Sequence, residues 1–550
     1  MTARIRPRRG AERHAVQEKS IEQLTAEIKA RYGIGGGGQG PQRFPILLIC
    51  PSHYDLDGYV VQWVRPAASP DSLETMHRQV EDALGRGVLG ADVETEVRSI
   101  DERTARVRPD KLVKELQGGH GLVILTGVQA NQFSRAMDIA LPLRVAGIPV
   151  CMEGLFVAGS VALQGVATPV LREAMNLGIS LLAGSPSQAQ VDKLVRDAWQ
   201  GRLQPLYQNE ESPAASGATP PIAATRLTSG MARAMRLLPF ECTFCTVVDV
   251  SGGSADAAEE RIRARLQHGS GRFLLADRNF SRNPEWEKIF DRLIAMREQE
   301  KLDLECVLQV DGVCHRLPRF LEKAARAGVR GVHVDLESGI GAGSAESHAR
   351  PDSISGYRTM LLEWKRVGVV VFARYAVGGR GETAEAVVRE VRMLKRELPV
   401  DVLEPGCASP WEAGEKPGAA AWREFYTPEH MEKVLRRALA TGTDLEELMA
   451  VLLWFHFCVV YERVDPLLGG SRRRKHRRDR RPSIEREDPL SFYPNYALER
   501  AYKRIGMARL YRRFRRFVRQ LEGEPGARSY TDPALAGTGG LLMPHVPAAR

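Results

Sequence analysis

Short apolar runs alternate with amphipathic stretches along most of the chain. The first run, FPILLIC at residues 44–50, is predicted to be a buried strand and precedes a polar loop, PSHYDLDG. Further strands are predicted at 92–100, 121–128, 147–154 and 179–184, with helical patterns at 129–146 and 187–200. Because strands and helices alternate, residues 44–205 are predicted to form a doubly wound, Rossmann-like α/β domain. Such domains bind ligands at the carboxyl ends of their strands.

A second series of strands and helices follows a segment without periodicity. Residues 206–230 are rich in Pro, Ala, Ser and Gly and are predicted to be a linker. Beyond it, helical patterns such as 283–300 and 315–328 separate six apolar runs, at 245–250, 272–280, 302–312, 328–338, 368–378 and 400–405. This alternation predicts a partial (β/α)6 TIM-type barrel over residues 231–412, with its chemistry at the carboxyl ends of the strands.

The remaining segments are predicted to lie outside these two domains. Residues 1–43 read as a basic, flexible leader without the apolar region of a signal peptide. Residues 413–470 are predicted to be a helical extension, and its 14-residue apolar run, 448–461, is too short to span a bilayer and is predicted to be a buried helix. Residues 471–550 are expected to hold an arginine-rich linker, an amphipathic helix and a disordered end.

The net charge of +10 is concentrated near the carboxyl terminus, in residues 471–481 and 500–519. The helix predicted at 495–521 places apolar residues largely on one face: Tyr502, Ile505, Leu510, Tyr511, Phe514, Phe517 and Val518. Three interpretations follow: a helix docked on the barrel with solvated arginines, contact of residues 471–521 with an anionic membrane surface, and nucleic-acid binding. The last is least favoured, because no recognition motif accompanies the arginines.

The eight cysteines are scattered along the chain, which favours free thiols in a reducing cytoplasm. The predicted location is therefore cytoplasmic, with peripheral membrane contact if residues 471–521 bind lipid. Two of the cysteines, Cys242 and Cys245, form a C-x-x-C pair directly before the first strand of the second domain. Alone, this spacing suits half a zinc site, a redox pair or two buried small residues. Next to the first strand of a barrel, the same pair would place its thiolates at the face of the barrel that carries the active site. Thiolates in that position can hold an iron–sulfur cluster.

Residues 236–405 resemble the core of radical S-adenosylmethionine (radical SAM) enzymes that carry an N-terminal cobalamin-binding-like domain. The stretch LPFECTFC matches the family pattern C-x-x-x-C-x-x-C, with Leu238 at the first cysteine. Further matches are ADRNFSRN (276–283), QVDGVCHRLP (309–318), VDLES (334–338) and GGRGET (378–383), and in the first domain ILLICPSHYDLDGYVVQW (46–63).

The resemblance implies a [4Fe–4S] cluster held by Cys242 and Cys245. Cys314, in the loop after the third strand, is expected at the same face of the barrel, where it is either a substitute third ligand or a small buried thiol. The resemblance also implies S-adenosylmethionine binding by eight residues: Asp277, Asn279, Gln309, Asp311, Glu337, Ser338, Gly378 and Gly379. The implied activity is radical chemistry on an unidentified small-molecule or lipid substrate. Cobalamin ligation by His53 is not expected, because Pro51 and Leu56 break the D-x-H-x-x-G pattern, whereas cobalamin binding without a histidine ligand stays open.

Two alternatives accompany this interpretation. Leucine has no donor atom, so the chain could be a degenerate, non-catalytic relative that keeps the fold for ligand binding or as a partner subunit. It could also be an unrelated barrel enzyme with a structural C-x-x-C pair. Strand alternation places His333, Asp335 and Glu337 on one face, and the same counting groups Glu305, Gln309 and Asp311 on the third strand. This predicts a polar barrel interior that either binds a ligand or pairs with Arg278 and Arg374.

Overall fold

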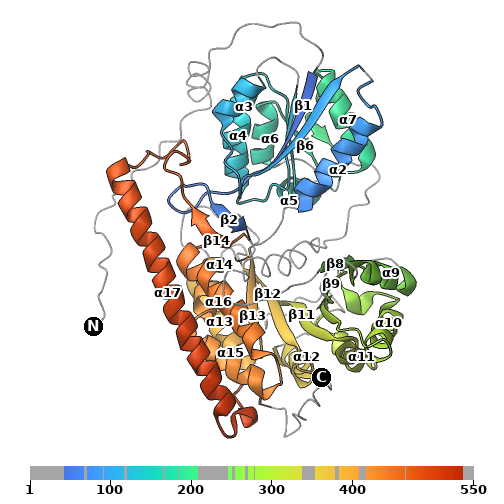
Figure 1. Ribbon diagram of the computed structural model, residues 1–550, viewed down its shortest axis with the longest axis vertical. Helices are drawn as coiled ribbons and strands as arrows, with labels where there is room; N and C mark the ends of the chain where they lie inside the picture. The colour runs from blue at the N-terminus through green and yellow to red at the C-terminus, as the bar shows by residue number, and fades with distance from the viewer. Residues whose placement is uncertain are drawn as a thin grey trace. The chain divides into compact units, whose positions relative to one another are not determined.

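The structure is a computed structural model that describes residues 43–66, 71–90, 92–116, 121–164, 168–184, 186–208, 246–250, 254–266, 271–277, 279–336, 354–377, 383–407, 417–464, 466 and 468–536. These residues divide into two compact units (Figure 1). Unit 1 falls within Met1–Gln62, Pro70–Ala215 and Arg474–Tyr496, and unit 2 within Trp63–Ser69, Ser216–Arg473 and Ala497–Arg550. The chain therefore returns to unit 1 after it has built most of unit 2.

Unit 1 is built on a six-stranded sheet in the order β3-β1-β4-β5-β6-β7, in which every neighbouring pair is parallel. The strands are β1 (Arg43–Cys50), β3 (Glu94–Asp101), β4 (Leu122–Leu125), β5 (Val150–Glu153), β6 (Ile179–Leu182) and β7 (Leu206–Tyr207). The helices are α2 (Asp71–Gly85), α3 (Pro109–Glu115), α4 (Phe133–Val145), α5 (Leu155–Gln164), α6 (Pro169–Asn176) and α7 (Gln188–Trp199).

Alternate residues of the strands enter two separate hydrophobic cores, one on each face of the unit 1 sheet. Leu47 and Ile49 of β1 join the core that contains α3, α4, α5 and α6, whereas Ile46 and Leu48 join the core that contains α2 and α7. Helices therefore cover both faces of a parallel sheet, as the alternation of strands and helices predicts.

Unit 2 contains a second six-stranded parallel sheet, whose strands follow one another in chain order from β8 to β13. The strands are β8 (Thr246–Asp249), β9 (Arg272–Ala276), β10 (Glu305–Val310), β11 (Val329–Leu336), β12 (Val370–Val377) and β13 (Val402–Cys407). The connecting helices are α9 (Ala255–Leu266), α10 (Trp286–Glu298), α11 (Phe320–Ala327), α12 (Ile354–Arg366) and α13 (Ala384–Glu397), with short turns η1 (Phe280–Arg282) and η2 (Cys314–Arg316). The sheet is open, with β8 and β13 as its edges. Its strand order agrees with the prediction, but the structure shows no closed barrel among the described strands.

One face of the unit 2 sheet packs against these helices. Val371, Ala373 and Tyr375 alternate along β12, are buried, and share this face, because the Tyr375 hydroxyl donates to Glu390 of α13. The buried Lys365 of α12 pairs with Asp401, next to β13, and also donates to the carbonyl of Val369. The intervening residues of β10–β13 point to the opposite face, which is called the inner face below.

Helices continue after β13: α14 (Pro417–Phe425), α15 (Pro428–Ala440) and α16 (Leu445–His456), which leads into a π-helical turn, η3 (Phe457–Glu462). The 448–461 run forms α16 and most of η3, and its residues from Leu448 to Phe455 are all buried, as predicted. In the parts of the chain that the structure describes, no helix has the length and apolar character needed to cross a membrane.

The carboxyl-terminal basic region is folded. Strand β14 (Gly470–Arg474), which contains the start of the arginine run, pairs with β2 (Gln62–Pro66). A Cβ atom added to Gly470 would lie 2.3 Å from Cγ of the buried Trp63, so only glycine fits this position. The long helix α17 (Pro489–Gly523) follows, and a short turn, η4 (Ala527–Ser529), comes after it.

Candidate ligand-binding site

Three of the predicted site residues meet at the carboxyl ends of β9 and β10. Asp277 and Asn279 follow β9, and Asp311 follows β10. The Asn279 amide Nδ2 donates to Asp311 Oδ2 over 3.3 Å, and the backbone N–H of Asn279 donates to Asp277 Oδ1 over 3.1 Å. The structure thus brings together residues that lie more than thirty positions apart in the sequence.

The two carboxylates of this cluster already have donors within the protein. Arg282 Nε donates to Asp311 Oδ2 over 2.7 Å, and Asn283 Nδ2 donates to Asp277 Oδ2 over 2.8 Å. The same Asn283 amide donates to the carbonyl of Val250, directly after β8. The cluster therefore fixes the positions of the loops after β8, β9 and β10 relative to one another.

A second polar group lies on the inner face of the sheet. The strand register aligns Gln309 of β10 with His333 of β11, and Arg374 of β12 with Glu404 of β13. We call Gln309, His333, Arg374 and Glu404 the inner layer. His333 Nδ1 and Glu404 Oε2 are 3.8 Å apart. Alternation along the strands predicts His333 and Gln309 on this face. No motif marks Glu404 of β13, so only the structure identifies it as a member of the layer.

His333 is the most buried member of the inner layer. Its residue is 2% exposed, and its ring stacks on that of Phe372, with centroids 4.7 Å apart. Burial, together with the nearby Arg374 charge, lowers the pKa of His333 to about 3. The imidazole is therefore neutral at physiological pH, and can donate from one ring nitrogen and accept at the other.

Several buried atoms of the inner layer have no hydrogen-bond partner among the residues that the structure describes: both ring nitrogens of His333, Oε1 of Gln309 and Nη2 of Arg374. Arg374 Nη1 pairs with Asp335 at 3.3 Å. Buried polar atoms without partners cost free energy and are rare in folded proteins. Gln309 Oε1 is an acceptor, Arg374 Nη2 is a donor, and the His333 ring can be either. Together these groups would suit a polar ligand with complementary hydrogen-bonding groups.

Cys314, the predicted third cluster ligand, begins η2 after β10 and is 1% exposed. Burial raises the pKa of its thiol to about 12, so the protonated thiol is the stable form in this environment. Iron ligation requires the thiolate. Within the described ranges, no three His, Cys, Asp or Glu side chains are grouped in a way that could hold a metal ion. The role of Cys314 as a ligand stays a prediction.

Other predicted site residues fall outside the described ranges, together with Leu238 and Arg278. They are Cys242, Cys245, Glu337, Ser338, Gly378 and Gly379.

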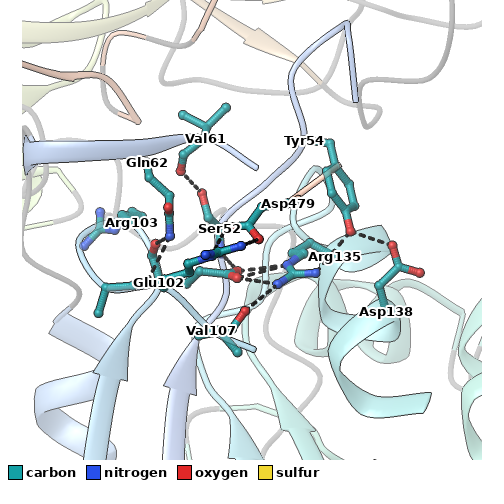
Figure 2. A network of polar contacts seen from close by, with 12 residues as sticks. Ser52, Tyr54, Val61, Gln62, Glu102, Arg103, Val107, Arg135, Asp138 and Asp479 are labelled. Atoms are coloured by element: carbon teal, nitrogen blue, oxygen red, sulfur yellow. Dashed lines mark hydrogen bonds and ion pairs between the residues drawn. The ribbon is translucent and has the colours of Figure 1, made fainter. Parts of the chain in front are cut away.

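A buried ion pair lies at the carboxyl edge of the unit 1 sheet (Figure 2). Glu102, after β3, accepts from Arg135 of α4 at Nε over 3.0 Å and at Nη2 over 2.6 Å. The backbone N–H of Ser52, after β1, donates to the same carboxylate over 3.0 Å. The side chains of Glu102 and Arg135 are 1% and 8% exposed. This pair therefore joins the loops after β1 and β3 to the first turn of α4.

The network continues from Arg135 to Tyr54 and Asp138 (Figure 2). Arg135 Nη1 donates to the Tyr54 hydroxyl over 3.3 Å, and that hydroxyl donates to Asp138 Oδ2 over 2.6 Å. Burial raises the pKa of Asp138, with Tyr54 and Arg135 opposing the effect. No sequence motif marks this network, because its members are of types that usually lie at the surface of loops and helices.

The unit 1 strand order places the point of strand reversal between β1 and β4, where ligands of such sheets bind. The loop after β1 folds back there: the His53 carbonyl accepts from Val61 N–H, and Asp55 Oδ1 accepts from Tyr59 N–H. A Cβ atom on Gly154 would lie 2.2 Å from the backbone nitrogen of Val128, so the loops after β4 and β5 are in direct backbone contact. The described loops at this edge are thus held by contacts with one another. Cobalamin binding without a histidine ligand stays a prediction.

A cavity of about 470 Å³ lies at the opposite, amino edge of the unit 1 sheet. It is lined by the carboxyl-terminal ends of α4, α6 and α7 and by the starts of β5 and β6, including Arg144, Gly178, Ser180 and Trp199. Doubly wound sheets bind ligands at the carboxyl edge. The position of this cavity therefore gives no reason to regard it as a functional site.

No family model and no curated protein matches the chain. Among solved structures, it is similar to the radical S-adenosylmethionine methyltransferase TsrM from Kitasatospora setae with cobalamin and [4Fe-4S] cluster bound, at 14% identity over 66% of this chain and 74% of that one, with a TM-score of 0.40. It is also similar to TsrM with tryptophan substrate and a SAM analog (aza-SAM) bound, at 15% identity over 66% of this chain and 72% of that one, with a TM-score of 0.39. A third similar structure is that of the cobalamin-dependent S-adenosylmethionine radical enzyme OxsB, at 11% identity over 75% of this chain and 57% of that one, with a TM-score of 0.35. Scores of this size do not establish a shared fold.

Proposed function

We propose that unit 2 is a radical SAM-type domain that binds S-adenosylmethionine on the inner face of its sheet and a [4Fe–4S] cluster through Cys242 and Cys245. The observation that carries the proposal is the inner layer, in which buried atoms of Gln309, His333 and Arg374 have no hydrogen-bond partner among the described residues. The layer belongs to a sequentially ordered parallel sheet whose first strand, β8, begins directly after Cys245. The resemblance of residues 236–405 to radical SAM enzymes supports the same assignment.

When bound, a reduced cluster and S-adenosylmethionine supply a 5′-deoxyadenosyl radical that removes a hydrogen atom from a substrate. The residues of this chain would orient the ligand and keep water away. Gln309 offers an acceptor, Arg374 a charged donor and His333 a neutral ring that can do either. Asp277, Asn279 and Asp311 support the rim by holding the loops above the strands in place.

Ligand binding is tested by isothermal titration calorimetry of the full chain with S-adenosylmethionine. Gln309→Met keeps the shape of the side chain and removes its acceptor, and His333→Phe keeps the stacking on Phe372 and removes both ring nitrogens. Each is expected to weaken binding about tenfold, as the loss of one buried hydrogen bond predicts. Gln299→Met, at the exposed end of α10, is the matched control. Equal affinity for all four proteins would contradict binding at the inner layer.

Cluster binding is tested by anaerobic reconstitution with iron and sulfide, followed by iron analysis and electron paramagnetic resonance. About four irons per chain are expected. The double variant Cys242→Ser/Cys245→Ser should lose them, and Cys306→Ala, a buried thiol of β10, should not. Loss of the cluster in Cys314→Ser as well would show that this thiol is the third ligand.

A second candidate function is a degenerate radical SAM relative that binds the ligand without a cluster. It is favoured by Leu238, which has no donor atom, at the first cysteine position. This candidate predicts S-adenosylmethionine binding that depends on Gln309, without iron, and a cluster that assembles in Leu238→Cys. Iron without ligand binding, or neither, would contradict it.

A further inference from the structure

Much of the carboxyl-terminal basic charge is used inside unit 1. Lys475 Nζ lies 3.2 Å from Asp57 Oδ2, and Arg480 Nε donates to the backbone carbonyl of Asp57 over 3.0 Å. Lys475 and Arg480 both lie over the ring of Tyr59, at 4.6 and 5.0 Å from its centroid. The arginine run of residues 471–481 is thus a structural part of the fold, and is not the part of the chain best placed to meet an outside partner.

Helix α17 holds the remaining basic cluster, and one of its sides is anchored in unit 2. Leu510, Phe514, Val518 and Leu521 are buried along this side. Beside them, Arg513 Nε pairs with Glu432 at 2.8 Å, and Arg515 Nη1 pairs with Glu446 at 2.8 Å. The apolar face expected from the sequence is therefore divided, since Tyr502 and Ile505 do not join the buried side.

The other side of α17 carries a single line of seven exposed residues, which we call the outer stripe. Leu498, Tyr502 and Ile505 are 68%, 63% and 51% exposed. Four exposed arginines, which form no ion pair with any residue that the structure describes, continue the line: Arg509, Arg512, Arg516 and Arg519. Successive members are alternately four and three positions apart, so they lie on one side of the helix over about 32 Å.

We propose that the outer stripe binds an anionic membrane surface. A row of arginines without a described ion-pair partner, next to exposed leucine, tyrosine and isoleucine, matches a lipid interface. Such an interface offers phosphates to the cations and, directly beneath the phosphates, acyl chains to the apolar side chains. The phosphates of a nucleic acid would bind the arginines, but its backbone offers no apolar surface on which leucine and isoleucine could be buried. A second copy of the helix is disfavoured in either direction. In a parallel pair the arginines of the two stripes would face one another, and in an antiparallel pair they would be buried against apolar side chains without a counter-ion.

The test is co-sedimentation of the full chain with phosphatidylcholine vesicles that contain or lack phosphatidylglycerol. Binding is expected only to the anionic vesicles. Neutralising the four arginines to glutamine should reduce partitioning by several hundred-fold, at about fivefold for each cation near the surface. A charge-matched control neutralises four exposed cations of other helices, which are Arg78, Lys111, Arg172 and Arg389. This control should reduce vesicle partitioning far less.

A second variant, Leu498→Gln/Ile505→Gln, separates the membrane from a nucleic acid. It keeps every arginine and is expected to reduce vesicle binding at least tenfold, because burial of two aliphatic side chains is lost. Binding of a double-stranded DNA oligonucleotide, measured by fluorescence anisotropy, should not change in the same variant. Three results would overturn the proposal: equal binding to neutral vesicles, equal loss in the charge-matched control, and binding to DNA with none to anionic vesicles. Because no residue of the outer stripe lies in the inner layer, these results do not depend on S-adenosylmethionine binding.

Discussion

Replacing Glu102 by glutamine is expected to destabilise unit 1 by about 3 kcal/mol or more. The change removes one negative charge and keeps the shape of the side chain. In the native protein the carboxylate accepts hydrogen bonds from two nitrogens of Arg135 and from the backbone N–H of Ser52. The glutamine amide can keep only part of this set, because its nitrogen is a donor facing other donors.

The magnitude follows from what is left behind. The Arg135 side chain is 8% exposed, so the glutamine variant leaves a guanidinium charge in the interior without its counter-ion. Removing one partner of a buried pair typically costs about 3–5 kcal/mol. Glutamine should fall at the lower end, since one acceptor oxygen remains. In the double variant Glu102→Gln/Arg135→Met the stranded charge is gone, and most of the lost stability should return.

The assay is urea unfolding followed by hydrogen exchange and mass spectrometry of peptides from β1 and α4. A local probe is needed because a chain with two units does not unfold in a single transition. Glu173→Gln, an exposed residue of α6, serves as the control and should cost less than about 0.5 kcal/mol. If Glu102→Gln matches this control, or if the double variant is less stable than the single one, the reasoning about the buried pair is wrong.

Three further changes have clear expected results. Gly470→Ala should lower the unfolding free energy of unit 2 by about 2 kcal/mol or more in thermal unfolding, because the methyl group would overlap Trp63. Burial raises the pKa of Glu447 from 4.5 to about 7, so the folded state retains a proton that the unfolded state releases. Stability should fall as pH rises from about 4.5 to 7, and Glu447→Gln should remove that slope. Asp401→Asn should cost about 3 kcal/mol or more in urea unfolding, because it strands the buried Lys365.

Each of these has its own contradicting outcome. Gly523→Ala adds a methyl group with no heavy atom within 4 Å, and an equal effect at Gly470 would show that Trp63 does not limit that site. An unchanged pH slope in Glu447→Gln would mean that Glu447 is not the source of the slope. An Asp401→Asn protein as stable as the native one would mean that Lys365 loses its charge without cost.

The parallel sheets could be predicted because their strands are buried on both faces and therefore appear as continuous apolar runs such as FPILLIC. The inner-face positions of His333 and Gln309 followed from strand alternation. The Glu102–Arg135 pair could not be predicted, since 33 residues separate two side chains of types that usually lie at the surface. The outward position of Tyr502 and Ile505 was also missed, because helical periodicity identifies a shared side but not the partner against which that side packs.

The return of residues 474–488 to the loop after β1 affects how the protein is made. The Tyr59 hydroxyl donates to Glu487, 428 residues later in the chain, over 2.9 Å. At ordinary rates of translation, about 20–90 seconds separate the synthesis of these two residues. During that time the strands of unit 1 have all emerged from the ribosome, but Asp57 and the Tyr59 ring still lack Lys475 and Arg480. A nascent chain halted before residue 474 should therefore carry a unit 1 whose sheet is protected from protease while its first loop is cut.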